Sequence, residues 1–150
     1  MAGLAGCSTV PLLEPASSGP ISAVAVDQGT AAALISSYRT AHGLSAVSLD
    51  PALQRVAQRQ AEAMASANEL SHEVDGDLPH RLARGGADRK AAVENVSAGY
   101  FSLESALAGW KRSPKHNENL LFGPMRRLGI AAASAPHTRY KTFWSLVMTN

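Results

Sequence analysis

Hydrophobic residues recur at helical spacing in two long stretches of the first half of the chain. Over residues 51–67 one face of the predicted helix is apolar and the other polar, the clearest amphipathic pattern in the sequence. Asp50 and Pro51 stand at its start as an N-cap and first-turn pair. Residues 30–42 show a similar spacing and end at Gly43, a residue typical of helix C-termini. Both stretches therefore predict helices that pack one face against a core.

The second half alternates short helical patterns with strand-like ones. The strand-like ranges are 91–99, 128–134 and 140–148, and the helical ranges are 79–83, 102–111 and 114–121. The last strand is apolar on both faces, so it requires cover from both sides. We therefore predict an α+β fold, a three-layer α-β-α sandwich in which a small, mainly antiparallel sheet is flanked by about four helices.

The length and composition fit one soluble domain. The chain has 150 residues, of which 45% are hydrophobic, 17% are charged and only 5% are aromatic. This length suffices for one core, and small side chains must fill much of it around anchors such as Trp110 and Trp144. No internal repeat and no second linker is evident, so we predict a single domain over residues 27–150.

Residues 1–26 have the composition of a processed terminus and a linker. Leu4-Ala5-Gly6-Cys7 resembles the bacterial lipobox, and the following residues are rich in Pro, Ser and Gly. Only three residues precede Leu4, so we interpret this region as a truncated signal joined to a flexible arm. A lipidated Cys7 would hold the domain at a membrane surface without a spanning helix. The alternative is an idle thiol; because Cys7 is the only cysteine, an internal disulfide is excluded.

The charge pattern argues against nucleic-acid binding. Nine of the 14 basic residues lie between Arg81 and Arg127, with four acids, although the formal net charge of the chain is only +2. No aromatic platform accompanies these charges, so we interpret them as a solvated surface.

Three polar residues stand close to predicted elements in a way that suggests chemistry: His72 after the second helix, Glu94 within a strand, and His116 at the start of a short helix. Each also has an ordinary structural interpretation. His72 fits a loop, Glu94 fits a pairing with an arginine, and His116 fits packing against the core.

Taken together, these three residues have the chemistry of a joint site. The start of a helix disfavours positive charge, so it should hold His116 neutral, as metal binding or proton acceptance requires. Two histidines and a carboxylate match the donors of a zinc site that keeps one position for water. His72 and His116 are nevertheless 44 positions apart, so the spacing alone does not indicate a metal.

Several motifs occur in the order that one known family shows. They are "SYRTAHGLSAVSLDPAL" at 37–53, "SH" at 71–72, "ENVSAG" at 94–99, "WKRSPKHNENLL" at 110–121, "LGIAAA" at 128–133 and "FWSLVM" at 143–148. In this order they resemble the CAP domain of the cysteine-rich secretory protein, antigen 5 and pathogenesis-related 1 superfamily. The resemblance is greatest to the short bacterial members, the SCP-like extracellular proteins, and covers nearly the whole folded region.

The resemblance implies an α-β-α sandwich in which His72, Glu94 and His116 meet in one cleft. Many relatives carry a second glutamate on the intervening helix. Glu104 is the candidate here, but an acid in a first turn is also explained by the helix dipole. We therefore expect a triad, with Glu104 as an alternative fourth member.

The family suggests three functions for such a chain. The favoured one is a monomeric, extracytoplasmic domain, secreted or anchored in the cell envelope, that binds a ligand or a partner protein through the cleft. An alternative is a zinc-assisted hydrolase, with the metal on His72 and His116 and with Glu94 as base or orienting group. A further alternative binds a lipid or sterol. Outside the hydrolase alternative, no cofactor is predicted.

Overall fold

One five-stranded sheet lies at the centre of the part of the chain that the computed structural model describes, residues 19–87 and 90–150. The elements in chain order are β1 (Ser22–Val24), α1 (Gln28–Ala41), β2 (Ser48–Leu49), α2 (Pro51–Ala67), α3 (Leu78–Arg84), β3 (Ala92–Ala98), α4 (Leu103–Arg112), α5 (Pro114–Leu120), β4 (Arg127–Ala135) and β5 (Lys141–Thr149). The predicted sandwich with a mainly antiparallel sheet is confirmed, with five helices in the described residues rather than about four.

The sheet has the order β1-β4-β5-β3, and all of these neighbours are antiparallel. β2 adds a short parallel pairing to the start of β4. β3 pairs only with β5 in the described sheet, so β3 forms one edge. This edge strand carries Glu94, and its position brings loops from both helical layers to the same margin.

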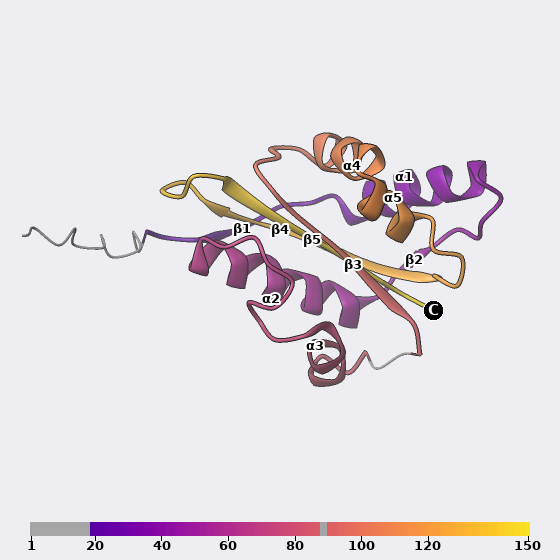
Figure 1. The fold of residues 1–150 in the computed structure, drawn as a ribbon, viewed down its shortest axis with the longest axis horizontal. Coiled ribbons are helices and arrows are strands. Elements are labelled where there is room, and N and C mark those ends of the chain that lie inside the picture. The colour runs from indigo at the N-terminus through magenta and orange to yellow at the C-terminus, as the bar shows by residue number, and fades with distance from the viewer. Residues whose placement is uncertain (1–18, 88–89) are drawn as a thin grey trace, which may run out of the picture.

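Helices cover both faces of the sheet, with α2 and α3 on one side and α1, α4 and α5 on the other (Figure 1). The alternation of β5 divides the core between them. Trp144, Leu146 and Met148 pack on the side of α1 and α4, whereas Phe143 and Val147 pack against α2. The prediction that this strand needs cover on both faces is thereby confirmed.

A buried arginine ties α1 to the segment that follows α5. Arg39 is 0% exposed, and its guanidinium donates five hydrogen bonds of 2.8–3.4 Å to backbone carbonyls. The acceptors are Ser45, Leu120, Phe122, Gly123 and Met125. Burial lowers the pKa of Arg39, and the charge of Arg126 lowers it further. The C-terminal end of α5 is thus fixed by side-chain donors from another helix.

The N-terminal boundary lies upstream of the expected one. The sequence predicts that the folded domain begins near residue 27, but β1 at Ser22–Val24 already pairs with β4. This strand has only three residues, too few for an alternating pattern to mark it, so it is identified by its pairing with β4. Cys7 lies outside the described residues.

Candidate functional site

Two consecutive residues of the edge strand β3 connect it to opposite helical layers. Because side chains alternate along a strand, Glu94 and Asn95 point to different faces of the sheet. The Glu94 carboxylate accepts from Arg81 of α3, and the Asn95 amide donates to the His116 carbonyl of α5 at 3.0 Å. The candidate site therefore lies around the margin of the sheet.

Arg81 and Glu94 form a buried, two-pronged ion pair. Nη1 of Arg81 is 2.7 Å from Oε2 of Glu94, and Nη2 is 2.9 Å from Oε1. Both side chains are 3% exposed or less. The same guanidinium also donates to the carbonyls of Gly76, at 2.7 Å, and His72, at 3.0 Å. Arg81 thus compensates the charge of Glu94 and holds the loop that carries His72.

His72 is joined to this pair through one ring nitrogen. Its Nδ1 lies 2.8 Å from Oε1 of Glu94. An ionised carboxylate can only accept, so Nδ1 carries the proton in this contact. In the neutral ring Nε2 then bears the lone pair. The His72 side chain is 54% exposed, whereas Glu94 is buried beneath it.

The contacts of Glu94 with Arg81 and His72 shift the pKa values of Glu94 and His72. Burial alone would raise the pKa of Glu94, but hydrogen bonds from His72 and Arg81, with the charge of Arg81, lower it overall. The hydrogen bond to Glu94 raises the pKa of His72 above its ordinary value, against the opposing effect of partial burial. Glu94 is therefore ionised at neutral pH, and His72 is more basic than a free histidine.

Two asparagines attach α5 to the edge strand. Nδ2 of Asn119 donates to the Glu94 carbonyl at 3.0 Å and to Oδ1 of Asn95 at 2.9 Å. The bond from Asn95 to the His116 carbonyl completes the set. α5 has only seven residues and no side-chain cap at Ser113, so these contacts fix a helix too short to be stable alone.

His116 belongs to the same electrostatic environment as His72. Burial lowers its pKa, the positive charge of His72 lowers it further, and a hydrogen bond with the Val96 backbone acts in the opposite direction. The ring is therefore neutral at neutral pH. The helix-dipole argument gave the same direction, but burial is the main cause.

The donors present do not complete a catalytic zinc site. Within residues 19–87 and 90–150 no group of three or more His, Cys, Asp or Glu side chains is arranged to hold a metal. Both oxygens of Glu94 are engaged by Arg81, so this carboxylate cannot bind a metal without breaking a buried ion pair. The two imidazoles remain as protein ligands, one fewer than catalytic zinc sites use.

Glu104 lies elsewhere. It is exposed in the first turn of α4 and lines a separate hollow with Leu34 and Lys111. Among the described residues it forms no hydrogen bond or ion pair with His72, Glu94 or His116. We define the histidine site as His72, Glu94, Arg81 and His116.

The structural interpretation of Glu94 as the partner of an arginine is confirmed, but the sequence did not identify this arginine as Arg81, nor did it show how Asn95 and Asn119 act in this site. Each occurs within or beside one of the motifs quoted above, but a motif gives only the identity of a residue and not the residue that it contacts. The available signal was an invariably charged guanidinium a few positions after "SH", which matches the need of a strand carboxylate for a counter-charge.

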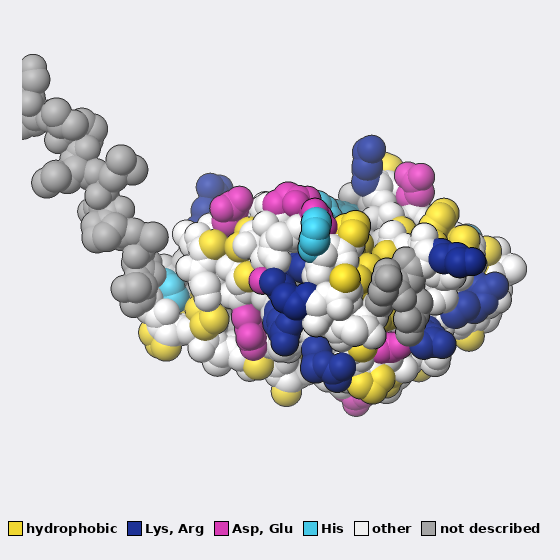
Figure 2. All heavy atoms as spheres, turned by 90° about the horizontal axis from the view of Figure 1, so that it is seen from below, with side chains coloured by type: hydrophobic (Ala, Val, Ile, Leu, Met, Phe, Trp, Pro, Cys, Tyr) yellow, Lys and Arg dark blue, Asp and Glu magenta, His cyan; other side chains and the backbone are white. Residues whose placement is uncertain are grey.

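Histidine side chains are also visible from outside, on the face formed by α2 and α3. Figure 2 shows them exposed among acidic and basic side chains there. On this side His72 and His80 are both exposed, and His80 contacts Asp77 of its own helix cap at 2.7 Å. His80 is therefore occupied locally, whereas Nε2 of His72 is directed away from its buried partner.

Comparison with known proteins gives a consistent picture. The family model for the cysteine-rich secretory protein family (CAP) matches residues 32–148. The chain is 31% identical over 103 residues to YlbC, an uncharacterised membrane protein of Bacillus subtilis strain 168. This alignment covers 67% of the chain but 30% of that protein, so the chain spans less than a third of its relative.

Solved structures extend the similarity to the fold. An extracellular protein of Bacillus anthracis that contains an SCP domain matches with a TM-score of 0.72 and 27% identity, over 82% of this chain and 40% of that one. An outer surface protein of Borrelia burgdorferi matches with a TM-score of 0.74 over 85% and 96% of the two chains, and at 17% identity it supports the fold alone. With the family match over residues 32–148, these findings show that the chain belongs to the cysteine-rich secretory protein (CAP) family, as a bacterial SCP-like domain.

Proposed function

We propose that this chain is an extracytoplasmic domain that binds a ligand or a partner protein at the histidine site without transforming it. The observation that carries the proposal is the complete engagement of Glu94. Its two oxygens accept three hydrogen bonds, from Arg81 and His72, and its side chain is 3% exposed. A carboxylate held in this way orients an imidazole and is unsuited to act as a base.

The site also lacks the pairing that activates a nucleophile. Among the described residues no serine or threonine hydroxyl forms a hydrogen bond with the ring of His72 or His116. His72 offers Nε2 of a ring that the bond to Glu94 orients, on a side chain that is 54% exposed. When neutral it accepts a hydrogen bond, and when protonated it donates one to an anionic group. Both are recognition contacts.

The proposed location follows from relatives. One similar structure is described as an extracellular protein and another as an outer surface protein. None of the helices within residues 19–87 and 90–150 is long and apolar enough to cross a membrane. For the form anchored in the cell envelope, we propose that attachment occurs through lipidation of Cys7.

The binding proposal is tested by site-specific photo-crosslinking in cells. A photoreactive amino acid replaces Glu73, which is exposed next to His72, and in a control it replaces Thr40, exposed on α1. We expect a crosslinked product from position 73 that is absent from position 40 and weakened by His72→Ala. Identical products from both positions, or none from position 73, would exclude binding at this site.

The hydrolase alternative requires a bound metal ion. It needs a metal held by His72 and His116 with ligands from outside the chain, because Glu94 is occupied. Metal analysis of protein purified without chelators, combined with assays on peptide, ester and phosphodiester substrates, tests it. A stoichiometric metal with activity lost in His116→Ala would replace the binding proposal by this one.

The lipid-binding alternative rests on the hollow that contains Glu104. Its volume is about 240 Å³, and Leu34, Leu107 and Ala108 give it an apolar lining between α1 and α4. This is smaller than the roughly 300–1,000 Å³ of pockets for drug-sized ligands. Mass analysis of organic extracts from the purified protein would detect a retained lipid.

A further inference from the structure

The hairpin between β4 and β5 presents exposed side chains at one end of the molecule. Figure 1 shows this hairpin at one end of the long axis and the C-terminus toward the other. The turn is fixed from within, because Thr138 is buried and its hydroxyl donates to the Ala135 carbonyl at 2.8 Å and accepts from the Lys141 N–H at 3.0 Å. The side chains around Thr138 are exposed, namely those of Pro136, His137, Arg139, Tyr140 and Lys141.

Lys141 occupies a backbone conformation that favours glycine. Its φ is 64°, in the left-handed region, where a residue with a Cβ atom is strained. Its Nζ donates to the Pro136 carbonyl at 3.2 Å, but this bond lies at the exposed surface and competes with water. The turn itself therefore gives little reason for a lysine at this position, and the charge is better explained by a contact outside the domain.

An exposed phenylalanine lies on a loop that is attached to the same hairpin. Phe101 is 71% exposed, more than any other large hydrophobic side chain in the described part of the chain. The preceding carbonyl, of Tyr100, accepts hydrogen bonds from Oγ1 of Thr142 at 2.6 Å and from Nε1 of Trp144 at 2.8 Å. Because both donors belong to the start of β5, Phe101 is positioned beside the base of the hairpin.

The N-terminal arm enters the domain at this end as well. β1 pairs with the end of β4, and Gly19 lies so close to the His137 ring that a side chain at Gly19 would collide with it. Cys7 stands twelve positions before Gly19, and such a stretch spans at most about 40 Å. The three segments that meet at this end contain no acidic residue: residues 19–26, 99–102 and 131–142.

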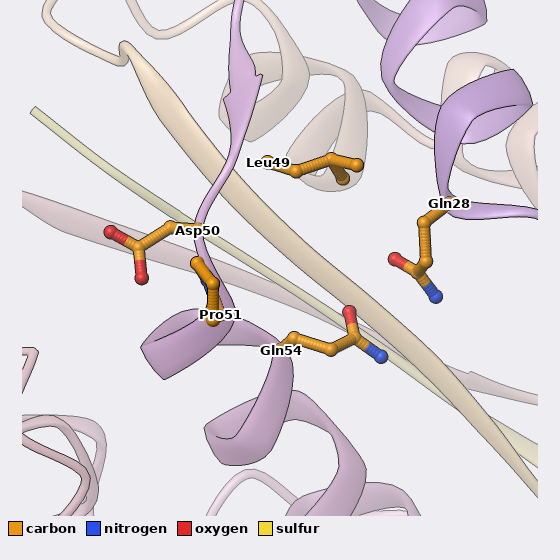
Figure 3. A pocket seen from close by; sticks show the side chains of 5 residues that line it. All are labelled: Gln28, Leu49, Asp50, Pro51 and Gln54. Carbon is orange, nitrogen blue, oxygen red and sulfur yellow. The ribbon is translucent and has the colours of Figure 1, made fainter.

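The opposite end of the sheet exposes apolar side chains in a different electrostatic setting. Leu49 is 44% exposed and Phe122 is 41% exposed, and both lie near the start of β4. Asp50 follows Leu49 directly (Figure 3), and its carboxylate lies 3.3 Å from Nη1 of Arg127. Exposed apolar surface at that end is therefore accompanied by an acid, whereas the segments at the hairpin end supply cations without acids.

We propose that the hairpin tip, defined as Phe101, His137, Arg139, Tyr140 and Lys141, contacts the surface of a bilayer that contains anionic phospholipids. The two aromatic rings would lie at the level of the headgroups, where such rings are favoured, and the cations would lie beside the phosphates. A lipid on Cys7 and the hairpin tip would act as two attachment signals on one side of the domain, and stable anchoring generally needs two. The proposal does not depend on ligand binding at the histidine site.

The test measures sedimentation of the full chain, without a lipid on Cys7, with vesicles of equal parts phosphatidylcholine and phosphatidylglycerol. We expect half-saturation on the order of 1 mM accessible lipid, as two cations and partly inserted aromatic rings provide. Binding should be much weaker to pure phosphatidylcholine, and it should decrease at high salt because the charges are screened.

Two substitutions separate the charges of the hairpin tip from the overall charge of the chain. Lys141→Gly should weaken binding about fivefold, the effect of one charge near an anionic surface, and it relieves the strained backbone, so a loss of binding is not explained by unfolding. Arg139→Gln should have a similar effect. Arg112→Gln, at an exposed position on α4, changes the net charge equally and should leave binding unchanged.

A fluorescence measurement locates the contact. Phe101→Trp and Phe122→Trp place a tryptophan at opposite ends of the sheet, whereas the native Trp110 and Trp144 are buried, at 1% and 2% exposed. A nitroxide-labelled phospholipid in the anionic vesicles should quench the fluorescence of the tryptophan at position 101 and leave that at position 122 unchanged.

Several results would overturn the proposal. They are the absence of binding to anionic vesicles, equal quenching at positions 101 and 122, and equal binding by Arg139→Gln and Arg112→Gln. Self-association of the chain without vesicles that is abolished by Phe101→Ser would also overturn it, because the hairpin tip would then bind a second copy of the chain. Sedimentation velocity over a range of protein concentrations measures this.

Discussion

Arg81 donates one hydrogen bond to each oxygen of Glu94 from the protein interior, and His72 donates a third to the same carboxylate from the solvent-exposed side. This order determines the chemistry of the site. The carboxylate is buried and compensated, and the imidazole above it is exposed and oriented. The residue that the sequence made a candidate base is therefore the support of a histidine.

Replacing Arg81 by methionine should strongly destabilise the domain. The change leaves the buried Glu94 charge without a partner, and breaking a buried pair in this way costs about 3–5 kcal/mol. Urea unfolding followed by circular dichroism measures the loss. The double variant Arg81→Met with Glu94→Gln removes both charges and should recover part of the stability; no recovery would mean that the ion pair is not the cause.

Removing the charge of Glu94 should lower the pKa of His72. In Glu94→Gln the strongest contact that raises this pKa is lost, while partial burial continues to lower it. Titration of the His72 ring protons by nuclear magnetic resonance gives the value directly. Glu73→Gln is the matched control, because Glu73 acts on His72 only through its charge and should cause a smaller decrease. An equal decrease in both variants would contradict the hydrogen-bonded geometry.

The two histidines should give the stability of the domain opposite pH dependences. The folded pKa of His72 is raised above its unfolded value of about 6.5, so its contribution is complete below that pH and is lost as pH rises through the folded pKa. The folded pKa of His116 is lowered, so the unfolded chain binds more protons below about pH 6.5. Its contribution is lost as the pH falls.

Together these effects should give a maximum in the unfolding free energy near about pH 6.5, where neither contribution has been lost. Urea unfolding across pH 5–9 tests this in the wild-type chain and in two variants. His72→Ala should flatten the profile above the maximum and, because the charge of His72 also lowers the pKa of His116, slightly reduce the slope below it, whereas His116→Ala should flatten the profile only below the maximum. A reversal of these two effects would show that the assigned pKa directions are wrong.

Local signals in the sequence were sufficient for most of the fold. The helix predicted over 51–67 is α2, Pro51–Ala67, because Asp50 caps it and its apolar face is unbroken. β1 and the pairing of β2 were not predictable in this way. Both are short and depend on the distant strand β4, so no periodicity in their own residues marks them.

The candidate site was predictable as a set of residues but not as a set of contacts. The resemblance named His72, Glu94 and His116, and the structure shows one direct bond among them, between His72 and Glu94. The contact from Arg81 to Glu94 crosses 13 positions and that from Asn119 to Glu94 crosses 25. Such contacts follow from topology, since only the position of β3 at the edge of the sheet makes Glu94 reachable from both layers.

Arg39 offers the last test, because it positions α5 without contacting the histidine site. Arg39→Lys keeps the charge but cannot reproduce five donors in a planar fork, so several buried carbonyls lose their partners. We expect a loss of about 2–4 kcal/mol in unfolding free energy, at about 1–3 kcal/mol for each unsatisfied group after partial relaxation. Because the end of α5 is then released, the His116 ring should become more solvated and its pKa should rise toward the ordinary value. Arg112→Lys, at an exposed position on α4, is the control and should change neither quantity. An Arg39→Lys chain that loses stability but leaves the His116 titration unchanged would show that α5 is positioned by Asn119 and Asn95 alone.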